Sequence, residues 1–252
     1  MNTKLISAGI VTYNNASEIT ECLDSLIHYT QGLDIHIYVF DNASQDRTVS
    51  LIREKFPQVF VIESKENKGF GYGHNQIMKI ISSDFHMVVN PDIQFTERSV
   101  IKLANFLERY PKVGIVTPQI KNPDGSEQFL PKKDPKFSYV ILSKFPHFRY
   151  YRDEYTRANE KFRKPTRILS STGCFFMIRT TIFKEQQGFD ERFFMYFEDA
   201  DLSRRVRKKA DIVFYPNTFV YHAWKRDNTR SLKGIKIFLT SSACPMPISR
   251  TI

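Results

Sequence analysis

The chain has 252 residues, a hydrophobic content of 41%, a charged content of 25% and a formal net charge of +10. This length can bury a substantial core in one large domain, and the composition is ordinary for a globular protein. No run approaches the roughly 18 apolar residues that a membrane-spanning helix needs, and the amino terminus predicts a first strand instead of a signal peptide. The three cysteines lack the spacing of a disulfide framework or a zinc site, which favours a reducing cytoplasm.

Apolar runs and helical patterns alternate along the first half of the chain. Short apolar runs predict strands over residues 5–13, 35–40, 59–63, 85–89 and 113–117. Apolar residues at helical spacing predict helices over residues 17–29, 46–56, 73–82 and 96–110, the second of them capped by Ser44 or Asp46. This alternation predicts an α/β fold with a mostly parallel central sheet and helices on both faces.

The pattern changes after Pro118. The sequence Asn122-Pro123-Asp124-Gly125 predicts a turn, and residues 132–167 then carry eleven Lys or Arg, four acidic residues and interleaved aromatic residues. Such a composition suits an anionic membrane surface, nucleic acid or a phosphate-bearing substrate, and a solvated charged face is the alternative. Beyond it we expect a strand over residues 168–179, helices over 180–186 and 199–209, and a strand over 212–215.

We interpret the chain as one domain that spans residues 1–240. It changes character after residue 118, and its second part, residues 119–240, carries the basic aromatic insertion at 131–167. Residues 231–240 have the pattern of a basic amphipathic helix. Residues 241–252 have no pattern, so we expect an irregular and truncated tail there.

Four polar loops follow the predicted strands of the first half, at residues 12–15, 41–46, 67–71 and 90–92. In open parallel sheets, ligands bind beyond the carboxyl ends of the strands, so these loops predict a polar ligand site. Asp41 and Asp92 stand where they can hold a ribose and a divalent metal, because Mg²⁺ and Mn²⁺ prefer carboxylate and phosphate oxygens. For Asn90-Pro91-Asp92, a simple turn is the alternative.

Several common catalytic motifs are missing from the sequence. The glycines of GFGYG, residues 69–73, lack the G-x-G-x-x-G spacing and do not follow the first strand, which disfavours a dinucleotide site. The sequence contains no Walker motif, no G-x-S-x-G elbow and no H-E-x-x-H. A hydrolase triad is therefore unsupported.

The segment FFMYFEDADLSRRVR, residues 193–207, is the strongest indication of chemistry. Its carboxylates Glu198, Asp199 and Asp201 stand between aromatic residues, which raise a carboxyl pKa, and arginines, which lower it. A carboxylate tuned in this way suits proton transfer. The alternative is structural: Asp199 caps a helix, Asp201 pairs with Arg205 and the aromatic residues fill the core.

Seven motifs occur in order between about residues 5 and 225: IVTYNN, VFDNASQDRT, NKGFGYGHN, VVNPD, STGCFFMIRTTIF, GFDERFFMYFEDADLSRRV and YPNTFVYH. Together they resemble the family 2 glycosyltransferases, and among these the bacterial rhamnosyltransferase-like members that build cell-surface polysaccharides. The resemblance implies a GT-A fold, with a Rossmann-like nucleotide-sugar-binding half over residues 1–118 and an acceptor and catalytic half over residues 119–240. It also implies a nucleotide-sugar donor, Mg²⁺ or Mn²⁺ and inversion at the anomeric carbon. We therefore expect transfer of L-rhamnose from dTDP-rhamnose, with galactofuranose, GlcNAc or glucose as the alternative sugars.

The resemblance also implies roles for individual residues. Asp199 would be the catalytic base, with Glu198 as the second candidate. Asp92 would end the metal-binding motif, in which Asn90 replaces the first carboxylate of the usual D-x-D, and His222 is a further metal or phosphate ligand with a structural role as its alternative. The nucleotide-sugar site would comprise Thr12, Tyr13, Asn14, Asp41, Asn42, Lys68, Gly69, Asn75 and Asn90.

The expected partners are a nucleotide diphosphate sugar and an acceptor that is a glycan or is linked to a polyprenyl diphosphate. We place the protein in the cytoplasm, at the inner face of the cell membrane, where residues 132–167 contact anionic lipid; no nucleic acid is expected. A nucleotidyltransferase is disfavoured, because no glycine-rich basic loop follows the first strand. A non-enzymatic protein that binds RNA or anionic lipid is the other alternative, but it leaves the strand-end aspartates unexplained.

Overall fold

The computed structural model describes residues 4–128, 157 and 160–223. Along these residues the elements run in the order β1 (Ile6–Thr12), α1 (Ile19–Tyr29), β2 (Ile35–Asp41), α2 (Thr48–Lys55), β3 (Phe60–Glu63), α3 (Phe70–Ile80), β4 (Phe85–Val89), β5 (Ile93–Gln94), α4 (Ser99–Arg109), β6 (Val113–Lys121), β7 (Thr166–Arg167), β8 (Phe175–Arg179), α7 (Thr180–Glu185), α8 (Glu198–Val206) and β9 (Asp211–His222).

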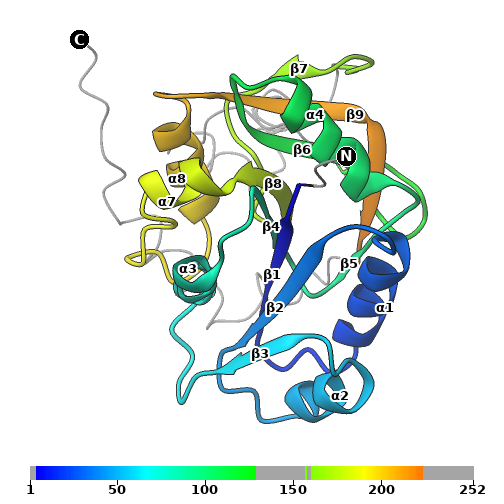
Figure 1. Cartoon of the computed structure of the whole chain (residues 1–252), viewed down its shortest axis with the longest axis vertical. Coiled ribbons are helices and arrows are strands. Elements are labelled where there is room, and N and C mark those ends of the chain that lie inside the picture. Colours follow the sequence, from blue (N-terminus) through cyan, green and yellow to red (C-terminus); the bar gives the residue numbers. More distant parts are fainter. Residues whose placement is uncertain (1–3, 129–156, 158–159, 224–252) are drawn as a thin grey trace, which may run out of the picture.

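The strands form one sheet in the order β3-β2-β1-β4-β8-β6-β9-β5, with β7 paired to β9 (Figure 1). The first four neighbours, β3, β2, β1 and β4, are parallel. β8 then inserts antiparallel between β4 and β6, and β9 runs parallel to β6. The prediction of an α/β fold with a mostly parallel central sheet is confirmed, and the antiparallel β8 is the place where the two halves of the chain meet.

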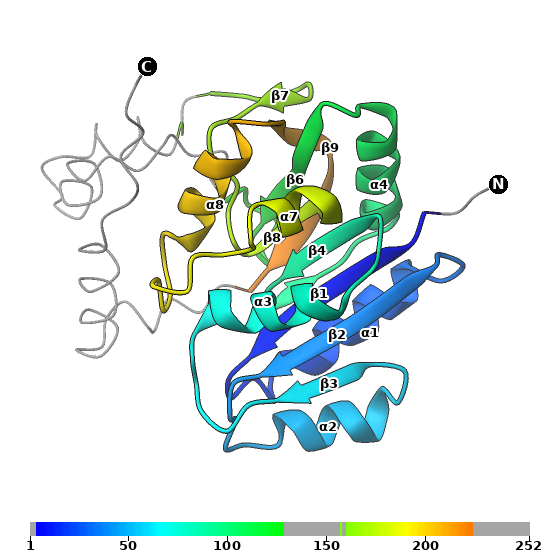
Figure 2. The same ribbon diagram turned by 60° about the vertical axis from the view of Figure 1, so that its left-hand side comes forward.

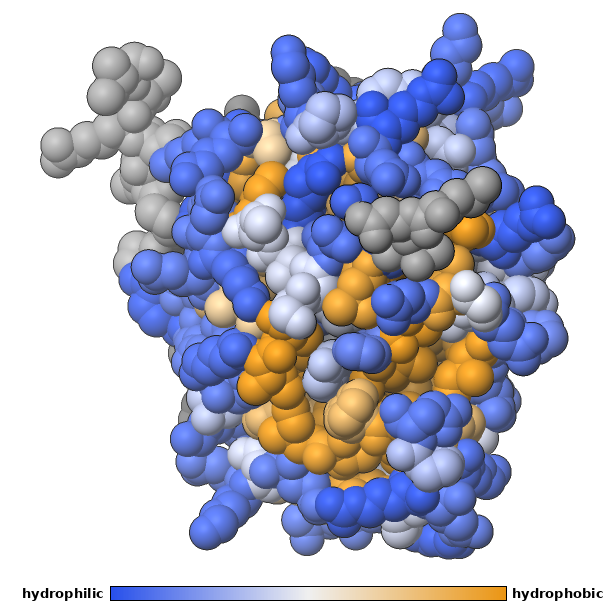
Figure 3. All heavy atoms as spheres, in the orientation of Figure 1, coloured by the Kyte–Doolittle hydropathy of each residue, from blue (hydrophilic) through white to orange (hydrophobic). Residues whose placement is uncertain are grey.

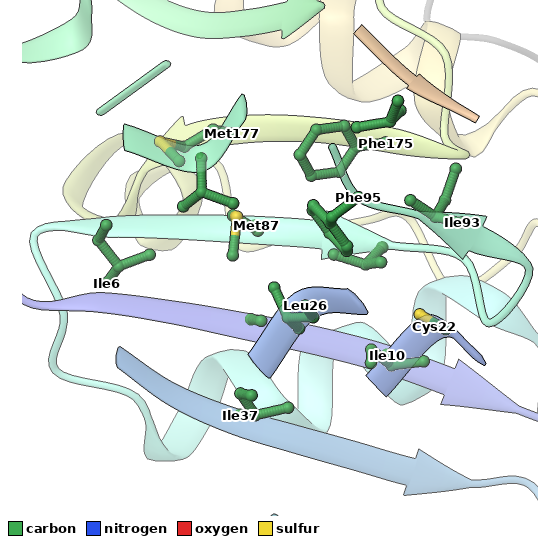
Figure 4. Packing of buried hydrophobic residues seen from close by; sticks show 14 of the residues in the cluster. Ile6, Ile10, Cys22, Leu26, Ile37, Met87, Ile93, Phe95, Phe175 and Met177 are labelled. Atoms are coloured by element: carbon green, nitrogen blue, oxygen red, sulfur yellow. The ribbon is translucent and has the colours of Figure 1, made fainter. Parts of the chain in front are cut away.

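Helices cover both faces of the sheet, as predicted (Figure 2). The main core contains residues of α1, α2 and α4 together with the inward side chains of the strands. β1 and β4 are buried at every position, as expected for central strands that are covered on both faces. In Figure 4, Met87 of β4 and Met177 of β8 lie in one cluster with Leu26 of α1. A second cluster on the opposite face contains residues of α7 and α8.

Several helices begin up to three residues away from their predicted starts, and α3 and α2 show the local reasons. α3 begins at Phe70, three residues before the predicted start, because Gly69 has a φ of +93° and lets the chain turn into the helix. α2 begins at Thr48, and neither predicted cap occupies the N-cap position, which belongs to Arg47. Asp46 still accepts a hydrogen bond from the Thr48 N–H at 2.9 Å, so it satisfies one of the N–H groups that a first helical turn leaves without a partner.

The predicted strand over residues 168–179 is wrong in its first half, because only Phe175–Arg179 pairs in the sheet. Residues 168–174 form the connection from β7, and the backbone N–H of Gly173 is held by a side chain of α8 instead of by a strand. β9 continues past the predicted end at residue 215, because its ladder with β6 shifts register from Tyr215 to Phe219 and so passes around Pro216. β5 was not predicted.

The turn predicted at residues 122–125 is confirmed, since the Gly125 N–H donates to the Asn122 carbonyl at 2.9 Å.

Other predictions concern segments outside the described residues. Most of the basic insertion, the helix predicted over 231–240 and the tail at 241–252 lie outside the described residues, so the domain boundaries stay predictions. No helix in the described part of the chain is long and apolar enough to cross a membrane.

Figure 3 shows hydrophobic side chains gathered over the part of the sheet that holds β1, β2 and β3. Phe60 on the edge strand β3 is 54% exposed and stacks on Tyr38 at a ring-centroid distance of 5.2 Å. Phe175 on the central strand β8 is fully buried and meets the edge of the Phe95 ring. The two phenylalanines therefore form a matched pair for testing how much the central strand contributes to stability.

Phe175→Ala should lower the free energy of unfolding by about 3–5 kcal/mol, because it leaves a cavity in the packed centre of the sheet. Phe60→Ala removes the same atoms from an exposed site and should cost about 1 kcal/mol. Urea unfolding of both variants and the wild type, followed by circular dichroism, measures the difference. Equal losses in the two variants would contradict this placement of the core.

Candidate active site

The ends of β1 and β2 form one side of the candidate site. Thr12 and Asp41 are register partners in the last pair of the two strands, and the Thr12 hydroxyl donates to the Asp41 carboxylate at 2.8 Å. Ser44 donates to the same carboxylate from its hydroxyl at 2.6 Å and from its N–H at 2.8 Å. Asp41 is 2% exposed. Its carboxylate therefore shapes the loop after β2, and a ligand that reaches it has to share these oxygens.

Asn14 connects the loops that follow β1 and β2. Its N–H donates to the Ser44 hydroxyl at 2.8 Å, and its side-chain oxygen accepts from the Gln45 N–H at 2.8 Å. The φ of Asn14 is 56°, a left-handed conformation that asparagine adopts more readily than most residues. Tyr13, its neighbour, is 43% exposed. Hydrogen bonds thus join the two loops into a rim, on which the Tyr13 ring is open to a flat ligand.

Asn42 joins this rim to the loop before α3. Its side-chain NH₂ donates to the Gly69 carbonyl at 3.2 Å, and its side-chain oxygen accepts from the Lys68 N–H at 3.2 Å. The Lys68 ammonium is exposed and pairs with Glu66 at 3.0 Å, and this carboxylate raises the pKa of the lysine. Thus the loops after β1, β2 and β3 are held together, and Lys68 adds a cationic side chain to them.

Asn75 has a different environment from the other residues expected at the nucleotide sugar. It is 4% exposed, and its amide bonds to the backbone of Phe189 and to the side chain of Glu191. The Asn75 amide therefore binds a loop of the second half of the chain, and its hydrogen bonds are made within the protein.

Asp92 and His222 face each other where β5 pairs with the end of β9. The Asp92 Oδ1 lies 3.3 Å from the His222 Nε2, and both side chains are largely buried. The other ring nitrogen of His222 lies 3.2 Å from the side-chain oxygen of Gln128, an arrangement that orients an imidazole toward a metal. No group of three or more metal-binding side chains occurs among the residues that the structure describes. One oxygen and one nitrogen ligand fit a divalent ion that takes its other ligands from phosphate and water.

Asp199 lies in the first turn of α8 with both carboxylate oxygens bound to backbone N–H groups. Gly173 donates to one oxygen at 2.9 Å, and Ala200 donates to the other at 2.8 Å. These bonds fix the side chain and favour its ionised form, as does the helix amino terminus. Asp199 is not the helix cap, because α8 begins at Glu198 and Phe197 occupies the N-cap position.

Glu198 is the buried neighbour of this carboxylate and is 6% exposed. Burial, and after it the negative charge of Asp199, raise the pKa of Glu198 to about 8. Glu198 therefore holds its proton near neutral pH. The two adjacent carboxyl groups thus have different environments, because Glu198 is desolvated and Asp199 is bound by two N–H donors.

The remaining acidic residue of this segment has a structural role. Asp201 is buried and pairs with Arg205 one helical turn later at 2.8 Å, which confirms the predicted pairing. In the aromatic run before it, only Phe193 is fully part of the core. The side chains of residues 194–197 are half-buried, so the interpretation of the whole run as core is wrong.

One backbone hydrogen bond connects the end of β4 to residues 173–174, where Gly173 binds the Asp199 carboxylate. The Asn90 N–H donates to the Cys174 carbonyl at 2.8 Å, and Cys174 directly follows Gly173. Asp92 and Asp199 therefore belong to the same end of the sheet, although they lie 107 positions apart in sequence (199 − 92). Neither Gly173 nor Gln128 was predicted as a site residue, because each acts through a partner that is distant in sequence.

A family model described as Glycosyl transferase family 2 matches residues 7–186. The chain belongs to this family. It is 28% identical over 240 residues to the N-acetylglucosaminyl-diphospho-decaprenol L-rhamnosyltransferase of Mycobacterium tuberculosis, a match that covers 87% of this chain and 76% of the relative. The family and these relatives make the protein a glycosyltransferase.

Solved structures support the fold. The crystal structure of S. aureus TarS 1-349 superposes on this chain with a TM-score of 0.64 at 18% identity. The match covers 86% of this chain and 60% of that one. The mannosyltransferase PcManGT from Pyrobaculum calidifontis, in complex with GDP-Man and Mn²⁺, superposes with a TM-score of 0.63 at 17% identity, with 90% of this chain and 59% of that one covered. The glycosyltransferase therefore spans less than two thirds of these solved chains, and the GT-A fold expected from the sequence is confirmed.

Glu198→Gln should change how stability depends on pH. The folded protein keeps the Glu198 proton up to a pH of about 8, whereas the unfolded chain releases it near its ordinary pKa of 4.5. Stability therefore falls as pH rises through this window, by up to about 1.4 kcal/mol per pH unit. Glutamine does not titrate, so the variant should gain stability relative to the wild type between pH 5.5 and 8.5.

Urea unfolding at these two pH values tests this expectation. Glu185→Gln is the control, because the Glu185 side chain on α7 is exposed and its replacement should leave the pH dependence unchanged. A constant difference between Glu198→Gln and the wild type at both pH values would show that Glu198 is not a protonated buried acid.

Proposed function

We propose that this glycosyltransferase transfers L-rhamnose, with inversion, from dTDP-rhamnose to an acceptor linked to a polyprenyl diphosphate. The observation that carries the proposal is that the paired side chains of Asp92 and His222 and the fixed carboxylate of Asp199 lie at one end of the sheet. The name of the mycobacterial relative supports the sugar and the acceptor class. Titles of solved structures with the same fold name UDP-GlcNAc and GDP-Man, so another nucleotide sugar is the alternative donor.

Asp199 is the better candidate for the base. Inversion requires a group that takes the proton from the acceptor hydroxyl as this oxygen attacks the sugar opposite the diphosphate. The N–H groups of Gly173 and Ala200 fix the Asp199 carboxylate in the first turn of α8. Glu198 already holds a proton near neutral pH, so it is not suited to accept another.

Asp92 and His222 would hold a divalent ion, Mg²⁺ or Mn²⁺. Such an ion stabilises the charge that develops on the leaving diphosphate. Gln128 would keep the imidazole of His222 oriented. Lys68 would add a cationic side chain beside the donor, and its pairing with Glu66 keeps it charged.

The nucleoside would lie along the rim formed by the loops after β1 and β2. Tyr13 offers an exposed ring for stacking on the base. Thr12, Asn14 and Asp41 hold the shape of the rim through their mutual loop contacts, and Asn42 ties the rim to Lys68 and Gly69. Asn90 would stand at the base of the site through its bond to Cys174.

The acceptor class also suggests where the protein works. A polyprenyl-linked acceptor lies in a membrane, so a peripheral contact by the basic residues 132–167 would bring the site to its substrate. These residues lie mostly outside the described part of the chain, and the contact stays a prediction from composition.

A thermal-shift panel of sugar nucleotides, with and without Mn²⁺, tests the donor. Ligand at 100 times its Kd stabilises a protein by about 2.7 kcal/mol, which corresponds to a rise in Tm of about 5–10 °C for this size. We expect the largest rise with dTDP-rhamnose and Mn²⁺, and loss of the Mn²⁺-dependent part in Asp92→Ala. The absence of any shift with every sugar nucleotide would contradict the proposed function.

Asp199→Asn should separate donor binding from transfer. Asparagine keeps the size of the side chain but does not take a proton, so kcat should fall by about 10²–10⁴-fold. The rise in Tm caused by the donor should stay unchanged. Transfer is measured with a synthetic polyprenyl-diphosphate glycan, and Glu185→Gln serves as the fully active control. Wild-type turnover in Asp199→Asn would assign the base to another residue.

A further inference from the structure

The amino terminus of α3 and the loop at residues 186–194, here called the α7–α8 loop, touch through their backbones. The Phe70 N–H donates to the Phe194 carbonyl at 3.0 Å. A Cβ on Gly69 would lie 2.3 Å from the same carbonyl oxygen, and a Cβ on Gly71 would lie 2.9 Å from the Cβ of Phe189. Residues 69–71 are therefore glycine-rich because another segment packs directly on their backbone.

Asn75 fixes this loop from the side of α3. Its NH₂ donates to the Phe189 carbonyl at 2.8 Å and to the Glu191 carboxylate at 2.9 Å, and its oxygen accepts from the Phe189 N–H at 2.8 Å. A Cβ on Gly188 would lie 2.0 Å from the Asn75 oxygen, so the loop approaches as closely as glycine permits. A single amide thus acts on both backbone groups of one loop residue.

Arg205 fixes the same loop from the side of α8. Its guanidinium donates to the carbonyls of Gln186 and Gly188, the latter at 2.8 Å. The same guanidinium is held by the buried carboxylate of Asp201 at 2.8 Å. The planar fork of arginine suits several acceptors at once, whereas the ammonium of lysine is a single point charge.

The chain between this loop and α8 has a strained backbone. Tyr196 and Phe197 have φ values of 74° and 71°, a region that bulky residues rarely occupy and that persists only where the surroundings enforce it. Phe197 directly precedes Glu198 and Asp199. The contacts of the α7–α8 loop lie just upstream of this turn, and the first hydrogen bonds of α8 lie just downstream of it.

We propose that Asn75 and Arg205 are positioning residues for the transfer reaction: together they hold the α7–α8 loop, and through the turn at Tyr196–Phe197 they aim the Asp199 carboxylate. The proposal rests on the proposed function, in which Asp199 is the base. It differs from a role in nucleotide binding, because Asn75 uses its amide within the protein, and from a role in phosphate binding, because Arg205 is engaged by Asp201 and two carbonyls.

The test uses two conservative variants and one stability control. Arg205→Lys keeps the charge beside Asp201 but loses the fork that binds two carbonyls. Asn75→Asp keeps the acceptor for the Phe189 N–H but loses the donor and repels Glu191. Ile52→Val is the control, because it removes one buried methylene from α2 and lowers Tm without touching the loop. All three are compared in kcat, donor KM and Tm with the donor that gives the largest thermal shift.

We expect kcat to fall about tenfold to 100-fold in each loop variant, because displacing a base by about 1 Å can cost 100-fold. Donor KM should change less than about twofold, and Ile52→Val should keep its kcat at a comparable Tm. The double variant should lose little more than the worse single variant, because both residues hold one loop. A kcat loss no larger than that of Ile52→Val, or a loss confined to KM, would overturn the proposal.

Hydrogen–deuterium exchange supplies a readout that needs no turnover. Exchange in peptides covering residues 187–197 should rise in Arg205→Lys and Asn75→Asp and stay at the wild-type level in Ile52→Val. Unchanged exchange in both loop variants would overturn the proposal even if activity fell. If the wild type binds no sugar nucleotide, the proposed function fails, and the exchange experiment still decides whether these two residues hold the loop.

Discussion

The backbone contact between Phe70 and Phe194 is the constraint on which the site depends. It joins the loop that precedes α3, which belongs to the first half of the chain, to the segment that leads into Asp199. Because Gly69 leaves no room for a side chain beside the Phe194 carbonyl, the two segments meet through main-chain atoms. The spacing between the loop before α3 and the segment that leads into Asp199 is therefore set by backbone geometry and hydrogen bonds, with few flexible side chains in between.

Three carboxylates in one short segment have three different environments. Glu198 is desolvated and keeps its proton, Asp199 is bound by two N–H groups, and Asp201 is neutralised by Arg205. A difference of this kind between neighbouring acids is what proton transfer at neutral pH requires, since one group has to be free to accept a proton. The segment also explains why its three acids are not interchangeable, although they lie on the same turn of one helix.

Local patterns predicted most of the first half of the fold, because its βαβ units are built from neighbouring segments. β1 and α1 lie within two residues of their predicted bounds. The site was less accessible to prediction, because its pairs are distant in sequence: Gly173 meets Asp199 and His222 meets Asp92. Residue type and strand-end position indicate which side chains gather at an edge, but they do not indicate which of them bond to each other. The length of β9 was missed for a similar reason, since the ladder with β6 carries it past Pro216.

The insertion of β8 between β4 and β6 has a consequence for synthesis of the protein. The parallel strands from β1 to β4 can assemble as soon as they leave the ribosome, but the open edge of β4 has no strand to pair with until residue 179 has emerged. At 5–20 residues per second this interval lasts on the order of ten seconds. During it, a nascent chain exposes an apolar edge that can pair with another chain. The strand that completes the enzyme therefore also sets the period in which the unfinished chain depends most on chaperones.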